Sequence, residues 1–223
     1  MEYFKLKSAI EDQIVGVYPQ SIKMTDDYFV RRSDSIWEMD IHSKIPPNLD
    51  GIQLVKHARA TDLLSVVPIS PIFGLVISEE GKEVLQNFNA PPHRFFEVKV
   101  YDHQKNETQK NYFLFRLLDF QNESISFERS KFMVSTKEKI QTLAIRTAAD
   151  LKNLSPELCM DMYPKLISLR SDFQFDIFYF DKIGGYFVSE RLKNAVESAG
   201  LTGMRFELPE FPILQEDKVT APN

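Results

Sequence analysis

The sequence predicts an α+β fold made of mostly antiparallel strands with a few short helices. Phenylalanine is abundant, with 18 copies in 223 residues, and aromatic side chains favour pleated, half-buried surfaces. Short apolar runs recur along the chain and are separated by turn-forming residues, as in strand-rich folds. A strand–helix–strand pattern appears twice, around residues 74–100 and 185–207.

The N-terminal half is predicted to alternate strands with turns and to hold one helix. Paired prolines and an Asp-Gly pair mark residues 44–51 as a loop. An apolar run opens residues 73–88 and then changes to helical spacing, which indicates a strand followed by a helix. The polar run 103–110 separates two clear strands and predicts an antiparallel hairpin. The strands expected in this half lie at residues 3–6, 14–18, 28–41, 94–102 and 111–120.

The C-terminal half is predicted to contain short helices between further strands. Thr147 precedes Asp150 by three residues, which is close to a capping-box arrangement. A second helix is expected over 155–163, with Ser155 as its cap and Pro164 ending or bending it. The strands expected in this half lie at residues 124–130, 131–135, 140–146 and 173–180.

Two segments of the chain align without gaps. "GLVISEEGKEVLQ" at 74–86 lies over "GYFVSERLKNAVE" at 185–197. The apolar residues after each serine fall on one face of an amphipathic helix, and both copies continue into a Phe-Glu pair. We therefore predict an internal structural duplication. The identical positions are Gly74/Gly185, Ser78/Ser189, Glu79/Glu190 and Lys82/Lys193.

Ser189 stands at a strand-to-helix turn, where some hydrolases place a nucleophile. The hydrolase elbow is G-x-S-x-G, with glycines because the turn is strained. Here the flanking residues are Phe187 and Arg191, and around Ser78 they are Val76 and Glu80. Serine followed by glutamate and a helical apolar phase is typical of an N-cap. Both serines are therefore predicted to cap helices.

The composition excludes several classes of protein. A net charge of −5 lacks the basic footprint that phosphate-backbone binding needs, so no nucleic-acid partner is expected. The lone cysteine, Cys159, allows no internal disulfide and fits a reducing compartment. The charged stretch 1–13 does not resemble a signal peptide, and no apolar run is long enough to cross a membrane. We therefore expect a cytoplasmic protein without a membrane partner.

The sequence offers few residues in arrangements typical of catalysis or metal binding. None of the four histidines stands four residues from another on a predicted helix, so no two-histidine metal face is expected. Adjacent acidic residues such as Asp26 and Asp27 are poorly arranged for paired catalysis, and no glycine-rich phosphate loop is present. We therefore expect no catalytic residue, no cofactor and no metal site.

The length is sufficient for one large domain or two small ones. We expect a single compact domain over residues 1–223. Within it, two lobes are expected at 1–120 and 121–208, followed by a tail at 209–223.

The stretch "GGYFVSERLKNAVESAGLTGMRFE" at 184–207 resembles the C-terminal signature of a bacterial immunity-protein family from polymorphic toxin systems, formerly a domain of unknown function. The stretch "ISEEGKEVLQNF" resembles the earlier element of that family, so the resemblance extends over residues 60–208. The matching positions are cap, core and turn positions and identify no toxin-binding residue. These signature positions are Ser78, Glu79, Lys82, Gly185, Ser189, Glu190, Lys193, Gly200, Gly203 and Phe206.

The resemblance implies a cytoplasmic, non-enzymatic antidote that binds and neutralises a cognate toxin or secreted effector, encoded by a neighbouring gene. Two alternatives stay open from the residues. One is an enzyme of unrecognised type that works from a pocket between the two repeat units. The other is an adaptor in a secretion-linked assembly.

Overall fold

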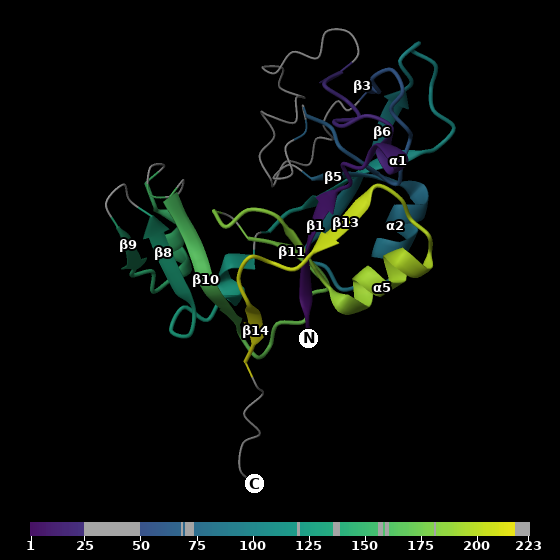
Figure 1. Cartoon of the computed structure of the whole chain (residues 1–223). Coiled ribbons are helices and arrows are strands. Elements are labelled where there is room, and N and C mark those ends of the chain that lie inside the picture. Colours follow the sequence, from purple (N-terminus) through teal and green to yellow (C-terminus); the bar gives the residue numbers. More distant parts are fainter. Residues whose placement is uncertain are drawn as a thin grey trace.

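Three β-sheets and several short helices form the part of the chain that the computed structural model describes (Figure 1). Most neighbouring strands in it are antiparallel, which confirms the predicted α+β class. The strands expected within 28–41 and the lone Cys159 lie outside the described residues. The described residues are 1–24, 50–67, 69, 74–119, 121–135, 139–155, 158, 161–180 and 182–216.

The largest sheet contains the predicted hairpin. Its two strands pair antiparallel, with Phe95 opposite Phe115, so the expected hairpin is confirmed. Phe115 is buried and packs its ring 5.3 Å from that of Phe95. In spatial order, the described strands are β2 (Lys23–Met24), β3 (Asp50–Gln53), β6 (His93–Tyr101), β7 (Tyr112–Leu117), β5 (Leu75–Ser78) and β4 (Leu63–Leu64).

The N-terminal strand lies in the middle of a second sheet. β1 (Tyr3–Ser8) pairs antiparallel with β12 (Tyr186–Ser189) on one side and with β13 (Met204–Glu207) on the other. β11 (Ile177–Tyr179) completes the order β11-β12-β1-β13. Every residue of β11 and β12 is buried, which explains why their sequences are continuous apolar runs rather than alternating ones.

A third sheet forms a separate layer, on the left in Figure 1. β8 (Lys131–Ser135) pairs antiparallel with both β9 (Ile140–Leu143) and β10 (Met162–Leu169). β14 (Ile213–Gln215) adds to the far side of β10 in parallel. The segment after Pro209, predicted only as a tail, therefore contributes a strand as far as Gln215.

Two of the helices start directly after a strand and lie side by side (Figure 1). These are α2 (Glu79–Leu85) and α5 (Glu190–Ser198). The capping box at Thr147 is confirmed, since its Oγ1 accepts from the N–H of Asp150 at 3.1 Å while the carboxylate accepts from the Thr147 N–H at 3.0 Å. The other described helices are α1 (Asp12–Val15), α3 (Ala148–Lys152) and the 3₁₀ helix η1 (Gln121–Ser124).

Two strand–helix–strand units share one strand order. In what we call the first unit the order is β4-β5-β7-β6, and in the second unit it is β11-β12-β1-β13, with all neighbours antiparallel. Tyr112 lies opposite Ser78 in the first unit, as Tyr3 lies opposite Ser189 in the second. The predicted pair of similar units is confirmed, and residues 3–8 supply the central strand of the second.

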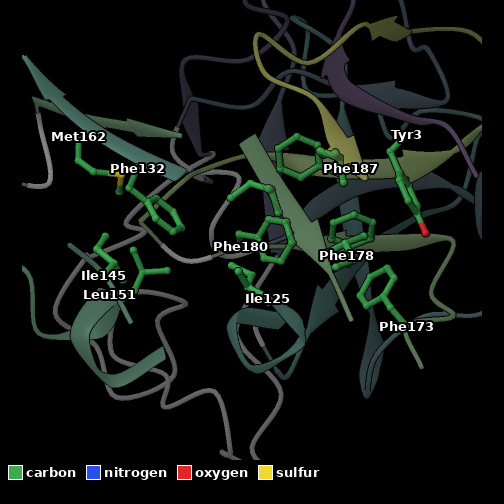
Figure 2. Packing of buried hydrophobic residues seen from close by; sticks show 13 residues of the cluster. Tyr3, Ile125, Phe132, Ile145, Leu151, Met162, Phe173, Phe178, Phe180 and Phe187 are labelled. Carbon is green, nitrogen blue, oxygen red and sulfur yellow. The ribbon is translucent and has the colours of Figure 1, made fainter. Parts of the chain in front are cut away.

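Buried aromatic side chains link the second unit to the third sheet (Figure 2). The ring centres of Phe178 on β11 and Phe187 on the neighbouring β12 lie 5.7 Å apart. Both residues belong to a cluster that also holds Phe132 and Met162. A second cluster packs the two units against each other and against α2 and α5. The abundance of phenylalanine therefore reflects core positions on several sheet faces.

The strand expected at residues 14–18 is wrong. The chain forms the single turn α1 there, and Gly16 ends it with φ of 75°. One helical turn buries Val15 completely and leaves Ile14 exposed. A short apolar run does not distinguish these two conformations, because its periodicity fits both.

In the C-terminal half one prediction is wrong, and another is wrong only at its end. Residues 124–130 form the end of η1 and a turn instead of a strand. The helix expected over 155–163 ends earlier than predicted. Leu158 and Asp161 are helical, and the Oγ of Ser155 accepts from the backbone N–H of Leu158 at 3.3 Å, as expected of the cap. Met162 and Tyr163 belong to β10 instead, and residues 156, 157, 159 and 160 lie outside the described ones. Pro164 lies inside β10 where the pairing with β8 shifts register, and such irregularities tolerate the missing N–H of proline.

Candidate functional site

Ser189 lies buried at the start of α5 and caps it. Its Oγ accepts from the backbone N–H of Leu192 at 3.2 Å and donates to the Oδ1 atom of Asp176 at 2.6 Å. The side chain is wholly buried, and its one proton is committed to the carboxylate. The predicted cap is confirmed, and a hydroxyl in this position is not available as a nucleophile.

Ser78 repeats this arrangement in the first unit. Its Oγ accepts from the Gly81 N–H at 3.1 Å and donates to the Oδ1 atom of Asp62 at 2.8 Å. It is also wholly buried. In both units the backbone N–H of the serine donates to the carbonyl oxygen of the same aspartate, at 2.8 Å.

Asp176 is a buried carboxylate held by donors from three directions. Besides Ser189, it accepts from Nε and Nη2 of Arg191 at 3.1 and 2.5 Å and from the backbone N–H of Asn89 at 3.0 Å. Burial by itself would raise its pKa, but these hydrogen bonds and the Arg191 charge hold the pKa below its usual range.

Asp62 is the matching carboxylate of the first unit. It pairs with the ammonium of Lys110 and accepts from the backbone N–H and the hydroxyl of Thr202 at 2.7 and 2.8 Å. Burial opposes ionisation here too, and the donors from Lys110, Thr202 and Ser78 lower the pKa of the carboxyl.

The two carboxylates bind the two units to each other. Asp176, of the second unit, accepts from Asn89, which follows α2 of the first unit. Asp62, of the first unit, accepts from Thr202, which follows α5 of the second. The exchange is reciprocal, so each aspartate fixes a helix start in its own unit and the chain after the helix of the other.

The shared lysines of the repeat also have matching environments. Lys82 places its Nζ 3.8 Å from the ring centre of Phe113, and Lys193 places its Nζ 5.3 Å from that of Phe4. Phe113 and Phe4 occupy equivalent places on the central strands of the two units. These lysines therefore cover aromatic surface while their ammonium groups interact with the ring faces.

The other signature residues occupy helix starts, turns and packing positions. Glu79 and Glu190 begin α2 and α5, where a negative charge complements the helix dipole. Phe206 packs, partly buried, in the cluster between the two units. The glycines of the signature, Gly185, Gly200 and Gly203, all have positive φ.

Sequence reasoning missed the two aspartates. They precede their serines by 16 and 13 residues, so a gapless alignment does not pair them. A signal exists nevertheless: Asp62 starts "DLL", Asp176 starts "DIF", and each motif leads into the strand beside the capping serine's strand.

Replacing Ser189 with alanine is expected to lower the free energy of unfolding by about 2 kcal/mol. A lost N-cap accounts for about 1 kcal/mol, and the lost bond to the buried Asp176 carboxylate adds about 1 kcal/mol more. Urea unfolding checks the value. Binding by the folded fraction should stay intact, and abolished binding in a fully folded variant would contradict the structural role.

Acid should destabilise the protein through Asp62 and Asp176. The folded-state pKa of each lies below its value of about 3.9 in the unfolded chain. The stabilisation is therefore present above about pH 4 and is lost as pH falls through the lower, folded-state pKa. Urea midpoints measured across this range should fall less steeply for an Asp62→Asn/Asp176→Asn variant than for wild type. An Asp172→Asn control should keep the wild-type slope.

A cavity of about 340 Å³ lies where the two units meet. Leu75 of the first unit and Tyr186 of the second contribute to its wall, and Lys7 and Arg205 approach it from β1 and β13. The two cations pair with Glu207 at 2.6 and 2.7 Å. The described lining also includes Lys5 and Tyr179, and it contains no histidine, cysteine or carboxylate.

The described residues show no metal cluster and no membrane-spanning helix. They contain no group of three or more His, Cys, Asp or Glu side chains arranged to hold a metal ion. None of their helices combines the length and apolarity needed to span a membrane.

Comparison with known proteins places the chain in a family. No curated protein matches it. The model of the immunity protein family Imm11 matches residues 2–208, which includes both units, both aspartate–serine pairs and the third sheet up to β10. The match also covers the signature stretch at 184–207. The chain therefore belongs to the immunity protein family Imm11.

Proposed function

We propose that the protein is a cytoplasmic bacterial immunity protein that binds a cognate toxin or secreted effector and neutralises it without catalysis. The observation that supports this most is the family match over residues 2–208. The buried and fully engaged serines are consistent with it, because the one catalytic arrangement suggested by the sequence has a structural explanation. The partner is a protein encoded by a neighbouring gene, and no nucleic acid, membrane or cofactor takes part.

Stoichiometry distinguishes this proposal from its rivals. The toxin encoded beside the gene should inhibit growth when expressed alone, and co-expression of this protein should restore growth. Purified components should neutralise at a fixed molar ratio and form a complex whose mass shows that ratio. Neutralisation at far lower ratios would instead indicate an enzyme. Failure to bind or protect against any neighbouring toxin would refute the proposal.

We also propose that the chain folds as one domain, with lobes 1–120 and 121–208 unfolding together. β1 belongs to the first lobe by sequence but pairs with β12 and β13 of the second. Asp62 and Thr202 tie the same two regions. Thermal unfolding should therefore show a single transition by both far-UV and near-UV circular dichroism, whereas two resolved transitions would show that the lobes fold independently.

A further inference from the structure

A groove of about 510 Å³ lies where residues 1–3 meet the segment 208–214. Three large apolar side chains on its walls face solvent: Met1 is 63% exposed, Leu208 is 67% exposed and Leu214 is 55% exposed. Clustered exposed apolar side chains of this kind mark interaction sites more often than scattered ones do.

The groove is held in shape by the core beneath it. Tyr3 packs edge-on against Phe178 at 5.2 Å between ring centres, and Phe211 lies 6.0 Å from Phe187. β14, at the end of the segment, pairs with β10 through Ile213. A surface supported in this way loses little conformational entropy when a partner binds.

The groove also carries unbalanced negative charge. Glu2 and Glu210 line it, and within the described part of the chain neither has an ion-pair partner. None of the described lining residues is a lysine, arginine or histidine. The cavity between the units differs in sign, because its described lining holds the cations Lys5, Lys7 and Arg205, of which the last two pair with Glu207.

One polar group at the groove is unsatisfied. The hydroxyl of Tyr3 is buried and has no hydrogen-bond partner among the described residues, whereas the equivalent Tyr112 donates to the carbonyl oxygen of Thr61 at 2.9 Å. The two equivalent tyrosines therefore differ in hydrogen bonding, and Tyr3 also lines the groove.

We propose that this groove docks the toxin through a segment that carries an apolar side chain flanked by lysine or arginine. This rests on the proposed immunity function and specifies its surface. The apolar side chain enters between Leu208, Leu214 and Met1. The flanking cations lie against Glu2 and Glu210. The net charge of −5 would speed the approach of such a segment.

Two double variants test the apolar contact and the ionic contact separately. Each is measured for binding to the purified toxin encoded beside the gene. Leu208→Ala/Leu214→Ala should raise Kd at least about tenfold, mainly through faster dissociation. Glu2→Lys/Glu210→Lys should slow association at low salt by about tenfold or more, with the difference shrinking as salt is added. Surface plasmon resonance measures both rates, and thermal melting confirms that each variant is folded.

The controls make changes of the same kind at exposed positions outside the groove. Ile140→Ala removes an apolar side chain that is 61% exposed on β9, and Glu83→Lys/Glu97→Lys makes the same change in net charge at exposed positions. Both should bind within about twofold of wild type.

Folded groove variants that bind like wild type would overturn the groove assignment and leave the immunity function standing. A wild-type protein that does not bind the toxin would overturn both. A wild-type dimer in light scattering that the leucine variant dissociates would assign the groove to a second copy of this chain instead.

Discussion

Replacing Asp176 with alanine is expected to lower the free energy of unfolding by about 3 kcal/mol. The change leaves the buried hydroxyl of Ser189 without an acceptor, which costs about 1–3 kcal/mol, and removes the partly buried hydrogen bond from the backbone N–H of Asn89, which contributes about 1 kcal/mol. The ion pair with Arg191 adds little, because the arginine side chain is 61% exposed. Urea unfolding followed by circular dichroism measures the change.

The matched control is Asp172→Ala. Asp172 is an aspartate only four positions away whose side chain is 74% exposed and pairs with the exposed Arg170 at 3.5 Å. Its removal should change stability by less than about 0.5 kcal/mol. Asp62→Ala should behave like Asp176→Ala, since Ser78 and Thr202 lose the same kinds of bond. Equal effects at Asp172 and Asp176 would contradict the role assigned to the two buried carboxylates.

Replacing Gly203 with alanine is expected to cost about 3 kcal/mol or more, from left-handed backbone strain together with a steric clash. Gly203 has φ of 81°, and a Cβ atom there would lie 2.3 Å from the carbonyl oxygen of Leu63 and 2.5 Å from the Oγ1 of Thr61. To relieve this clash, the chain around residue 203 would have to move away from β4. That movement would pull the adjacent Thr202 from Asp62, so the damage should extend to the contact between the units.

Gly200 provides the control because it isolates the backbone contribution. Its φ is 67°, and a Cβ atom there would meet nothing within 4 Å. Gly200→Ala should therefore cost only about 1 kcal/mol, from the left-handed conformation alone. Comparable losses for the two variants in urea unfolding would show that Gly203 is not tightly packed against Leu63 and Thr61.

Features that depend on neighbouring residues could be predicted from the sequence. The caps at Ser78, Ser189 and Thr147 were predictable because a cap bonds to backbone only three residues away. The repeated strand–helix–strand pattern was predictable because both copies keep the same helical apolar phase. The strand prediction at 14–18 was wrong because its short apolar run fits one helical turn as well as a strand.

Features that depend on distant residues required the fold. Asp62 meets Thr202 across 140 positions and Asp176 meets Asn89 across 87, and no local periodicity marks such pairs. The central strand of the second unit comes from the opposite end of the chain. The groove likewise exists only because residues 1–3 and 208–214 are brought together.

The sequence by itself determined the fold class, the capped helices, the duplicated unit and the resemblance to immunity proteins, because all of these are carried by local spacing. Tertiary structure alone decided that Ser78 and Ser189 each serve a buried carboxylate, and that the two carboxylates hold the units together. It also decided which apolar residues near the chain's two ends face solvent together. Hydrogen bonding and burial join residues that are neighbours only in space, so the candidate toxin-facing surface could be located only in the folded chain.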